Sequence, residues 1–108
     1  RYYYLHASGD SQDVGLGGYY LSSHMFVNIT LPTTMRTAPS VVYVSGTDYY
    51  KISRNGATDN FNDFSGGGSA SLNEISLYNN SQVSGSGGDA GYIRTNNASA
   101  SIALNSEL

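Results

Sequence analysis

Residues 23–31 limit the possible folds most strongly, because apolar and polar side chains alternate along them. Met25, Val27, Ile29 and Leu31 are each separated by one residue. This period of two is typical of a strand with one buried face. Nowhere does an apolar pattern at i, i+3, i+4 and i+7 last three turns behind a capping residue. We therefore predict an all-β protein with almost no helix.

Further strands are predicted from β-branched and aromatic runs between turn residues. Residues 41–45 and 48–53 form two such runs around Gly46, and we expect them to pair as a hairpin. Asn55-Gly56 is the strongest tight-turn dipeptide, since both residues tolerate positive φ. Two more strand candidates are residues 91–95 and 98–104.

Residues 57–69 contain only two large apolar groups, Phe61 and Phe64, and we expect a long surface loop there. Leu72, Ile75, Leu77 and Tyr78 then predict a strand that has a β-bulge near residues 73–74.

The composition favours one domain of about seven or eight short strands. The 108 residues include 13 Gly, 17 Ser, 10 Asn and 7 Thr, which suit turns and exposed strand faces. Ten Tyr add large side chains that can fill a core. Short strands joined by such turns predict an antiparallel, jelly-roll-like β-sandwich over residues 1–108.

The charge pattern argues against several classes of partner. The net charge is -3, and four Arg and one Lys, Lys51, are spread along the chain. Without a basic patch, we expect no nucleic acid partner. No apolar run approaches the ~20 residues of a membrane helix, so we expect no membrane insertion. The absence of Cys excludes disulfides and thiolate chemistry.

The chain offers little for catalysis or metal binding. Its two histidines, His6 and His24, lie in strand candidates without a nucleophile motif. The densest oxygen cluster, Asp59, Asn60, Asn62 and Asp63, lacks the spacing and the glycine of a calcium loop. We therefore expect no enzyme activity, no cofactor and no metal.

The tyrosines leave two interpretations open. In Tyr19-Tyr20 and Tyr49-Tyr50, adjacent strand residues point to opposite faces, so one ring of each pair is expected inside and the other outside. The outer rings then serve a subunit contact or form a platform for sugar rings.

Three stretches carry a resemblance to a known family: Tyr19-Tyr20, Leu31-Pro32-Thr33-Thr34-Met35-Arg36-Thr37-Ala38-Pro39-Ser40-Val41, and Ala100-Ser101-Ile102-Ala103-Leu104-Asn105-Ser106-Glu107-Leu108. The chain resembles the C-terminal domain of tailed-bacteriophage structural proteins, especially tail fibre or appendage proteins. Their pattern runs "LP-x-x-MR-x-x-P-x-V" and ends close to "A-x-I-x-L-x-A-E-L". The start at Arg1 is expected either of a piece of a longer chain or of a processed small protein.

The resemblance implies a virion protein, a homotrimer of β-sandwich domains at the tip of an appendage. Such a tip contacts other virion proteins and the host cell surface. Loops 58–68 and 84–89 are then the expected contact surface. Tyr49, Tyr50, Phe61 and Phe64 are the candidate contacts for a cell-surface glycan. Phage fibre tips that chelate iron carry paired H-x-H motifs, which this chain lacks, so we expect no metal-stapled trimer.

The segment between residues 32 and 39 has a physical interpretation of its own. Pro32 and Pro39 lack amide donors and restrict the residues before them, which predicts a bent connection between two strands. Arg36 is then placed to bind loop carbonyls or carboxylates such as Glu107, on the same or a neighbouring chain. With Met35, these residues are expected to serve structure or assembly.

Two other functions compete with an appendage tip. A capsid decoration protein, stabilising the viral shell as a small trimer, would have the same sandwich and the same sequence motifs. A glycan-degrading enzyme would need two positioned carboxylates, and the two Glu and six Asp lie mostly in turn-like contexts.

Overall fold

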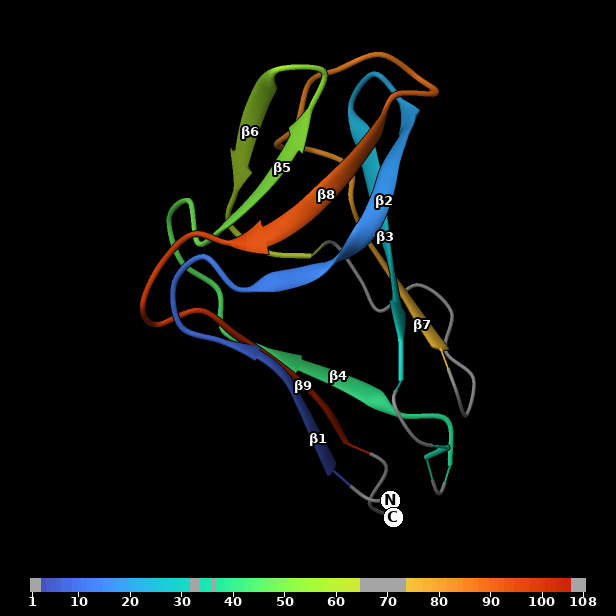
Figure 1. Ribbon diagram of the computed structural model, residues 1–108, viewed down its shortest axis with the longest axis vertical. Coiled ribbons are helices and arrows are strands. Elements are labelled where there is room, and N and C mark those ends of the chain that lie inside the picture. The colour runs from blue at the N-terminus through green and yellow to red at the C-terminus, as the bar shows by residue number, and fades with distance from the viewer. Residues whose placement is uncertain (1–2, 32–33, 36, 65–73, 106–108) are drawn as a thin grey trace.

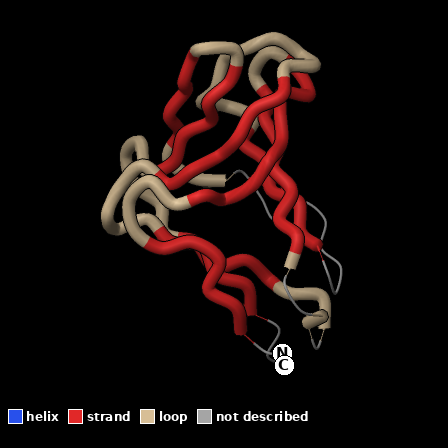
Figure 2. Tube along the Cα trace, in the orientation of Figure 1, coloured by secondary structure: helices blue, strands red, loops and turns tan. Residues whose placement is uncertain are grey.

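The computed structural model describes residues 3–31, 34–35, 37–64 and 74–105. Nine strands and no helix occur in these ranges, as Figure 2 shows. No described element is a helix able to cross a membrane. The strands are β1 (Tyr3–Ser8), β2 (Asp13–Leu21), β3 (His24–Thr30), β4 (Ser40–Tyr43), β5 (Tyr50–Arg54), β6 (Ala57–Phe61), β7 (Glu74–Asn79), β8 (Ala90–Thr95) and β9 (Ser101–Asn105).

The strands form two antiparallel sheets that enclose one core. The small sheet has the order β1-β9-β4, and the large sheet has the order β6-β5-β8-β2-β3-β7 (Figure 1). Tyr3 pairs with Asn105, so the beginning of β1 and the end of β9 are neighbours. The β5–β6 and β2–β3 turns lie at the opposite end of the molecule, at the top of Figure 1. The predicted all-β sandwich is confirmed.

The alternation in residues 23–31 builds the centre of the large sheet. Met25, Val27 and Ile29 are at most 1% exposed, and the residues between them are exposed. β3 pairs with β7 without a register shift, from Met25↔Asn79 to Thr30↔Glu74. Burying such side chains contributes about 1.5–3 kcal/mol each.

An aromatic cluster fixes the two sheets to each other. Phe64 lies 4.9 Å from the ring of Tyr50 and 5.6 Å from that of Tyr43, measured between ring centroids. Tyr50, in the large sheet, donates its hydroxyl to the carbonyls of Val44 (2.6 Å) and Ser101 (3.1 Å) on the small-sheet side. Each ring therefore adds packing and a satisfied polar tip.

The predicted hairpin of residues 41–45 and 48–53 is wrong. β4 pairs with β9 in the small sheet, whereas β5 pairs with β6 and β8 in the large sheet. Between them the chain crosses from one sheet to the other, so that Tyr43 and Tyr50 pack on Phe64 from opposite layers. The free energy gained by packing both tyrosine rings on Phe64 outweighs the tendency of neighbouring strands to pair as a hairpin.

The predicted surface loop 57–69 is also wrong over its first part. Asn55 and Gly56 have φ of 45° and 76° and form the expected tight turn, with Arg54 paired to Ala57. That turn continues directly into β6, because Phe61 can be buried opposite Tyr50. Residues 65–69 lie outside the described residues. The β-bulge was predicted near residues 73–74; residue 73 also lies outside the described residues, and Glu74 pairs with Thr30 without a register shift.

Candidate functional site

The outer face of the large sheet carries the candidate site. Ile52 and Ile93 are fully buried, so the residues on either side of them point away from the core. On β5 these are Lys51 and Ser53, and on β8 they are Tyr92 and Arg94. Their pairing brings them into two rows across the sheet. One row is Asn60, Lys51, Arg94 and Asp13, and the other is Thr58, Ser53, Tyr92 and Leu16.

Two open hollows lie side by side on this face. One, of about 490 Å³, lies between residues 53–58 of the β5–β6 turn, residues 90–92 and Leu16. The other, of about 340 Å³, is lined by Asp13, Gly15, Leu16, Tyr92 and Arg94. Both volumes lie within the range of small-molecule sites, about 300–1,000 Å³. We call the two hollows together the outer groove.

Leu16 and Tyr92 line both parts of the outer groove. Leu16 is 75% exposed and Tyr92 is 43% exposed, so both present apolar surface to solvent. Arg94 places its guanidinium carbon 4.9 Å from the centre of the Tyr92 ring and donates from Nε to Asp13 at 2.8 Å. The groove thus offers an apolar ridge with charged groups at one end, an arrangement suited to an amphipathic ligand.

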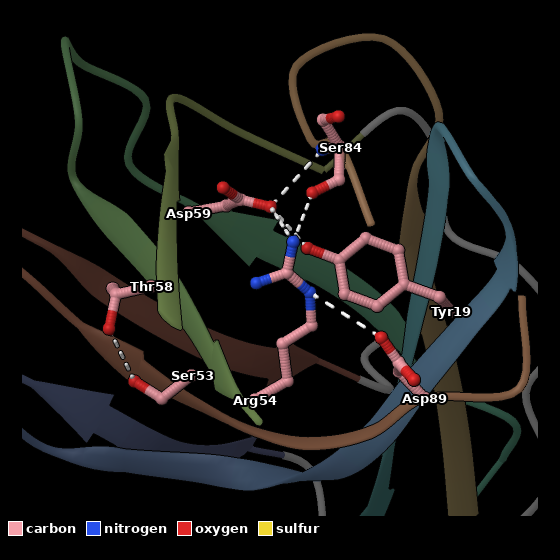
Figure 3. A network of polar contacts seen from close by, with 7 residues as sticks. All are labelled: Tyr19, Ser53, Arg54, Thr58, Asp59, Ser84 and Asp89. Atoms are coloured by element: carbon pink, nitrogen blue, oxygen red, sulfur yellow. Dashed lines mark hydrogen bonds and ion pairs between the residues drawn. The ribbon is translucent and has the colours of Figure 1, made fainter. Parts of the chain in front are cut away.

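A network of polar contacts lies at the end of the sheet next to the groove (Figure 3). Arg54 lies 3.3 Å from Asp59, 3.9 Å from Asp89 and 4.9 Å over the ring of Tyr19. The guanidinium also donates to the carbonyl of Ser84, and the Tyr19 hydroxyl donates to Asp59. Desolvation and the Asp59 hydrogen bond raise the pKa of Tyr19.

This network fastens the segment 84–89 to the sheet. The amide of Ser84 donates to Asp59 at 3.1 Å, and the amides of Gly85 and Gly88 donate to Ser22 and Tyr19 at 2.7 and 2.8 Å. A Cβ at Gly85 would lie 2.7 Å from the Tyr19 ring, so the close approach requires glycine. Segment 84–89, which we expected to be a contact loop, is therefore anchored to the sheet, while Ser84 and residues 86–88 are exposed. Its role as a contact surface stays a prediction.

Three of the predicted glycan contacts are wrong. Tyr50, Phe61 and Phe64 are at most 1% exposed and belong to the aromatic cluster of the core. They cannot reach a ligand on the surface while the protein is folded. Burial raises the pKa of Tyr50 to about 12 and also raises that of Tyr43.

Tyr49, the fourth predicted contact, is partly buried and packs against the core. The Tyr19-Tyr20 pair divides as predicted, with Tyr19 2% exposed and Tyr20 69% exposed. In Tyr49-Tyr50, Tyr50 points inward as expected. Tyr49, expected to point outward, is instead partly buried against the core.

Two of the five predicted assembly residues lie within the described residues. Met35 and Pro39 are buried, Met35 being 2% exposed, which fits a structural role for that connection. Pro32, Arg36 and Glu107 lie outside the described residues. The predicted contact between Arg36 and Glu107 therefore stays a prediction.

The histidines and acidic residues serve local structure. His6 donates from Nε2 to the Val14 carbonyl at 2.5 Å, and His24 packs between the rings of Tyr20 and Tyr78. Asp59 belongs to the network around Arg54. Over the part of the chain that the structure describes, no three His, Cys, Asp or Glu side chains form a group that could hold a metal ion.

Sequence reasoning missed the residues of the outer groove. The strand predicted at residues 91–95 contained the signal for two of them, because a buried Ile93 requires Tyr92 and Arg94 to face the other way. Nothing in the sequence around Leu16 indicates exposure. Its neighbours are glycines, whose pattern does not say which face of β2 is inside.

Comparisons with family models, with curated proteins and with solved structures found no match for this chain.

Proposed function

We propose that this protein is a non-enzymatic, glycan-binding tip domain of a bacteriophage tail fibre or appendage. The observation that carries the binding role is the outer groove, where Leu16 and Tyr92 are exposed between two hollows. A sugar ring has an apolar C–H face that stacks on an aromatic ring, and hydroxyls that hydrogen-bond to polar neighbours. Tyr92 supplies the ring, while Ser53, Thr58 and Arg94 supply the polar groups.

The resemblance of residues 19–20, 31–41 and 100–108 to phage structural proteins supports the virion setting. In this proposal the domain acts in the virion as a homotrimer. An apolar row on the outer face of the small sheet supports self-association: Leu5 and Val42 are 51% and 55% exposed on either side of Ala103. Ala103 itself is 4% exposed, so Leu5 and Val42 supply the accessible apolar surface that a subunit contact would bury.

Glycan binding is tested with a panel of immobilised bacterial surface polysaccharides, both neutral and acidic. We expect at least one polysaccharide to retain the protein, and Tyr92→Ala to weaken that binding at least tenfold. Tyr20→Ala is the matched control, because Tyr20 is an even more exposed tyrosine of the same sheet, 69% against 43% for Tyr92, but lies outside the groove. Retention by none, or equal retention of Tyr92→Ala, would contradict the proposal.

The position in the virion is tested with antibodies against the domain and electron microscopy of the particles that carry it. Labelling at the distal end of the tail appendage is expected. Labelling spread over the shell would instead indicate capsid decoration.

A further inference from the structure

The chain places two cations side by side on the outer face. The described residues contain three Lys or Arg side chains, and Arg54 is enclosed with Asp59 and Asp89. The other two, Lys51 and Arg94, are direct partners across β5 and β8. Directly opposite residues have Cβ atoms about 4.5–5.5 Å apart, and like charges at that distance destabilise a sheet.

Existing contacts leave this pair incompletely neutralised. Asp13 binds Arg94 at 2.8 Å, but its side chain is 81% exposed, and such surface pairs are weak. On the other side of Lys51 lies Asn60, which carries no charge. The row therefore carries two cations and one anion, and a second anionic group would neutralise it.

The cations lie next to the apolar ridge of the outer groove. Tyr92 is two residues before Arg94 on the same face, and the guanidinium lies 4.9 Å over its ring. Lys51 is a diagonal neighbour of Tyr92 across β5 and β8, a distance of about 7–8 Å that a long side chain spans. Because Arg94 lies over part of the Tyr92 ring, a sugar ring would pack on the exposed part of that ring and on Leu16, with a carboxylate on its C5 carbon turned toward both cations.

We infer that the outer groove binds an anionic polysaccharide, with a uronic-acid ring on Tyr92 and its carboxylate between Lys51 and Arg94. The inference rests on the proposed function and names the class of glycan. Charge-assisted hydrogen bonds from both side chains would hold the carboxylate, and salt would weaken them.

The test measures affinities of the whole chain for oligomers of galacturonate, mannuronate and hyaluronan. Each is paired with its carboxyl-reduced counterpart, which keeps the rings and linkages but has no charge. We expect at least one acidic oligomer to bind at least tenfold tighter than its reduced form, and more weakly as salt rises.

Single substitutions test which side chains bind the carboxylate. Lys51→Gln and Arg94→Gln should each weaken the acidic oligomer about tenfold, whereas Lys51→Arg, which keeps the charge, should change the affinity less than threefold. Thermal melting reports folding independently. Lys51→Gln removes a like-charge pair, so its melting temperature should equal or exceed that of the wild type.

The outcomes separate this inference from the proposed function. If acidic and reduced oligomers bind equally, or if Lys51→Gln binds as the wild type does, the inference is overturned and glycan binding stands. If neither form binds and the polysaccharide panel also gives no binding, both are overturned.

Discussion

At the scale of single residues, the structure separates aromatic side chains that build the core from those, such as Tyr92, that face solvent. Tyr50 sits at the centre of the aromatic cluster, and Tyr19 reaches the Arg54 network. Both hydroxyls are hydrogen-bonded, as buried polar groups require. The ring of Tyr92, by contrast, lines the outer groove. Position, rather than residue type, decides the role.

The buried tyrosines predict a loss of stability in alkaline solution. Burial raises the pKa of Tyr50 to about 12, above its ordinary value near 10, and the pKa values of Tyr19 and Tyr43 are also raised. The neutral phenol is favoured in the folded state, so stability is unchanged below pH 10 and falls as pH rises toward the folded pKa. For Tyr50 the slope between these two pKa values is about 1.4 kcal/mol per pH unit.

Urea unfolding between pH 8 and pH 12 checks this. Tyr50→Phe should be less stable at pH 8, because two carbonyls lose their donor, but should show a shallower decline above pH 10. Equal slopes for the two proteins would show that Tyr50 does not titrate with folding.

At the scale of elements, β2 depends on glycine to lie close to its neighbours. A Cβ on Gly17 would overlap the carbonyl oxygen of Phe26 in β3, and a Cβ on Gly15 would lie 2.5 Å from that of Asn28. Both overlaps are with backbone atoms, which cannot turn aside as a side chain can. The glycines therefore allow an approach that any other residue would prevent.

Gly17→Ala should consequently destabilise the domain by about 2–4 kcal/mol, within the range of strained and overpacked substitutions. Leu16→Ala, at the adjacent exposed position, should change stability by less than about 1 kcal/mol. Chemical denaturation of both variants is the measurement. A Gly17→Ala protein as stable as the wild type would mean that β2 and β3 lie farther apart than described here.

The elements also show how far the sequence could be read. β3, β8 and the Asn55-Gly56 turn were predictable, because each carries a strong local signal. β6 was missed, since Ala57–Phe61 is polar except at its ends and gains its place from pairing with β5. The partner of β4 was missed because β9 lies about 60 residues further along the chain. Local sequence patterns predict where strands occur, whereas burial against residues far along the chain determines which strands pair.

The same reasoning explains the errors in the candidate site. Phe61 and Phe64 stand among polar residues in the sequence, which suggested exposed aromatic contacts. Once β6 pairs with β5, Phe61 lies opposite Tyr50 on the buried face. Conversely, the glycines beside Leu16 do not indicate which face of the strand it lies on, and only the register of β2 with Tyr92 shows that it faces outward.

At the scale of the whole molecule, the two sheets present different outer faces. The large sheet carries the outer groove with its charged row. The small sheet carries the apolar row of Leu5, Ala103 and Val42. In the proposed assembly, the small sheet contacts other copies and the large sheet stays free for the glycan.

This division predicts that Val42→Lys weakens self-association. Placing a charge in an apolar contact should lower the association constant at least tenfold, because the charge would lose its water. Sedimentation velocity over a range of concentrations measures it. Ser53→Lys, on the outer face of the large sheet, is the control and should leave association unchanged. If Val42→Lys associates as the wild type does, the small sheet is not the subunit contact.

The central claim is that the outer groove is the binding surface. It is tested most directly by titrating the isotope-labelled protein with the tightest-binding oligosaccharide and mapping the amide shifts by NMR. We predict that the largest shifts fall at Leu16, residues 51–53 and residues 91–94. Shifts centred on Leu5 and Val42 or on segment 84–89, or no shifts at all, would contradict the account.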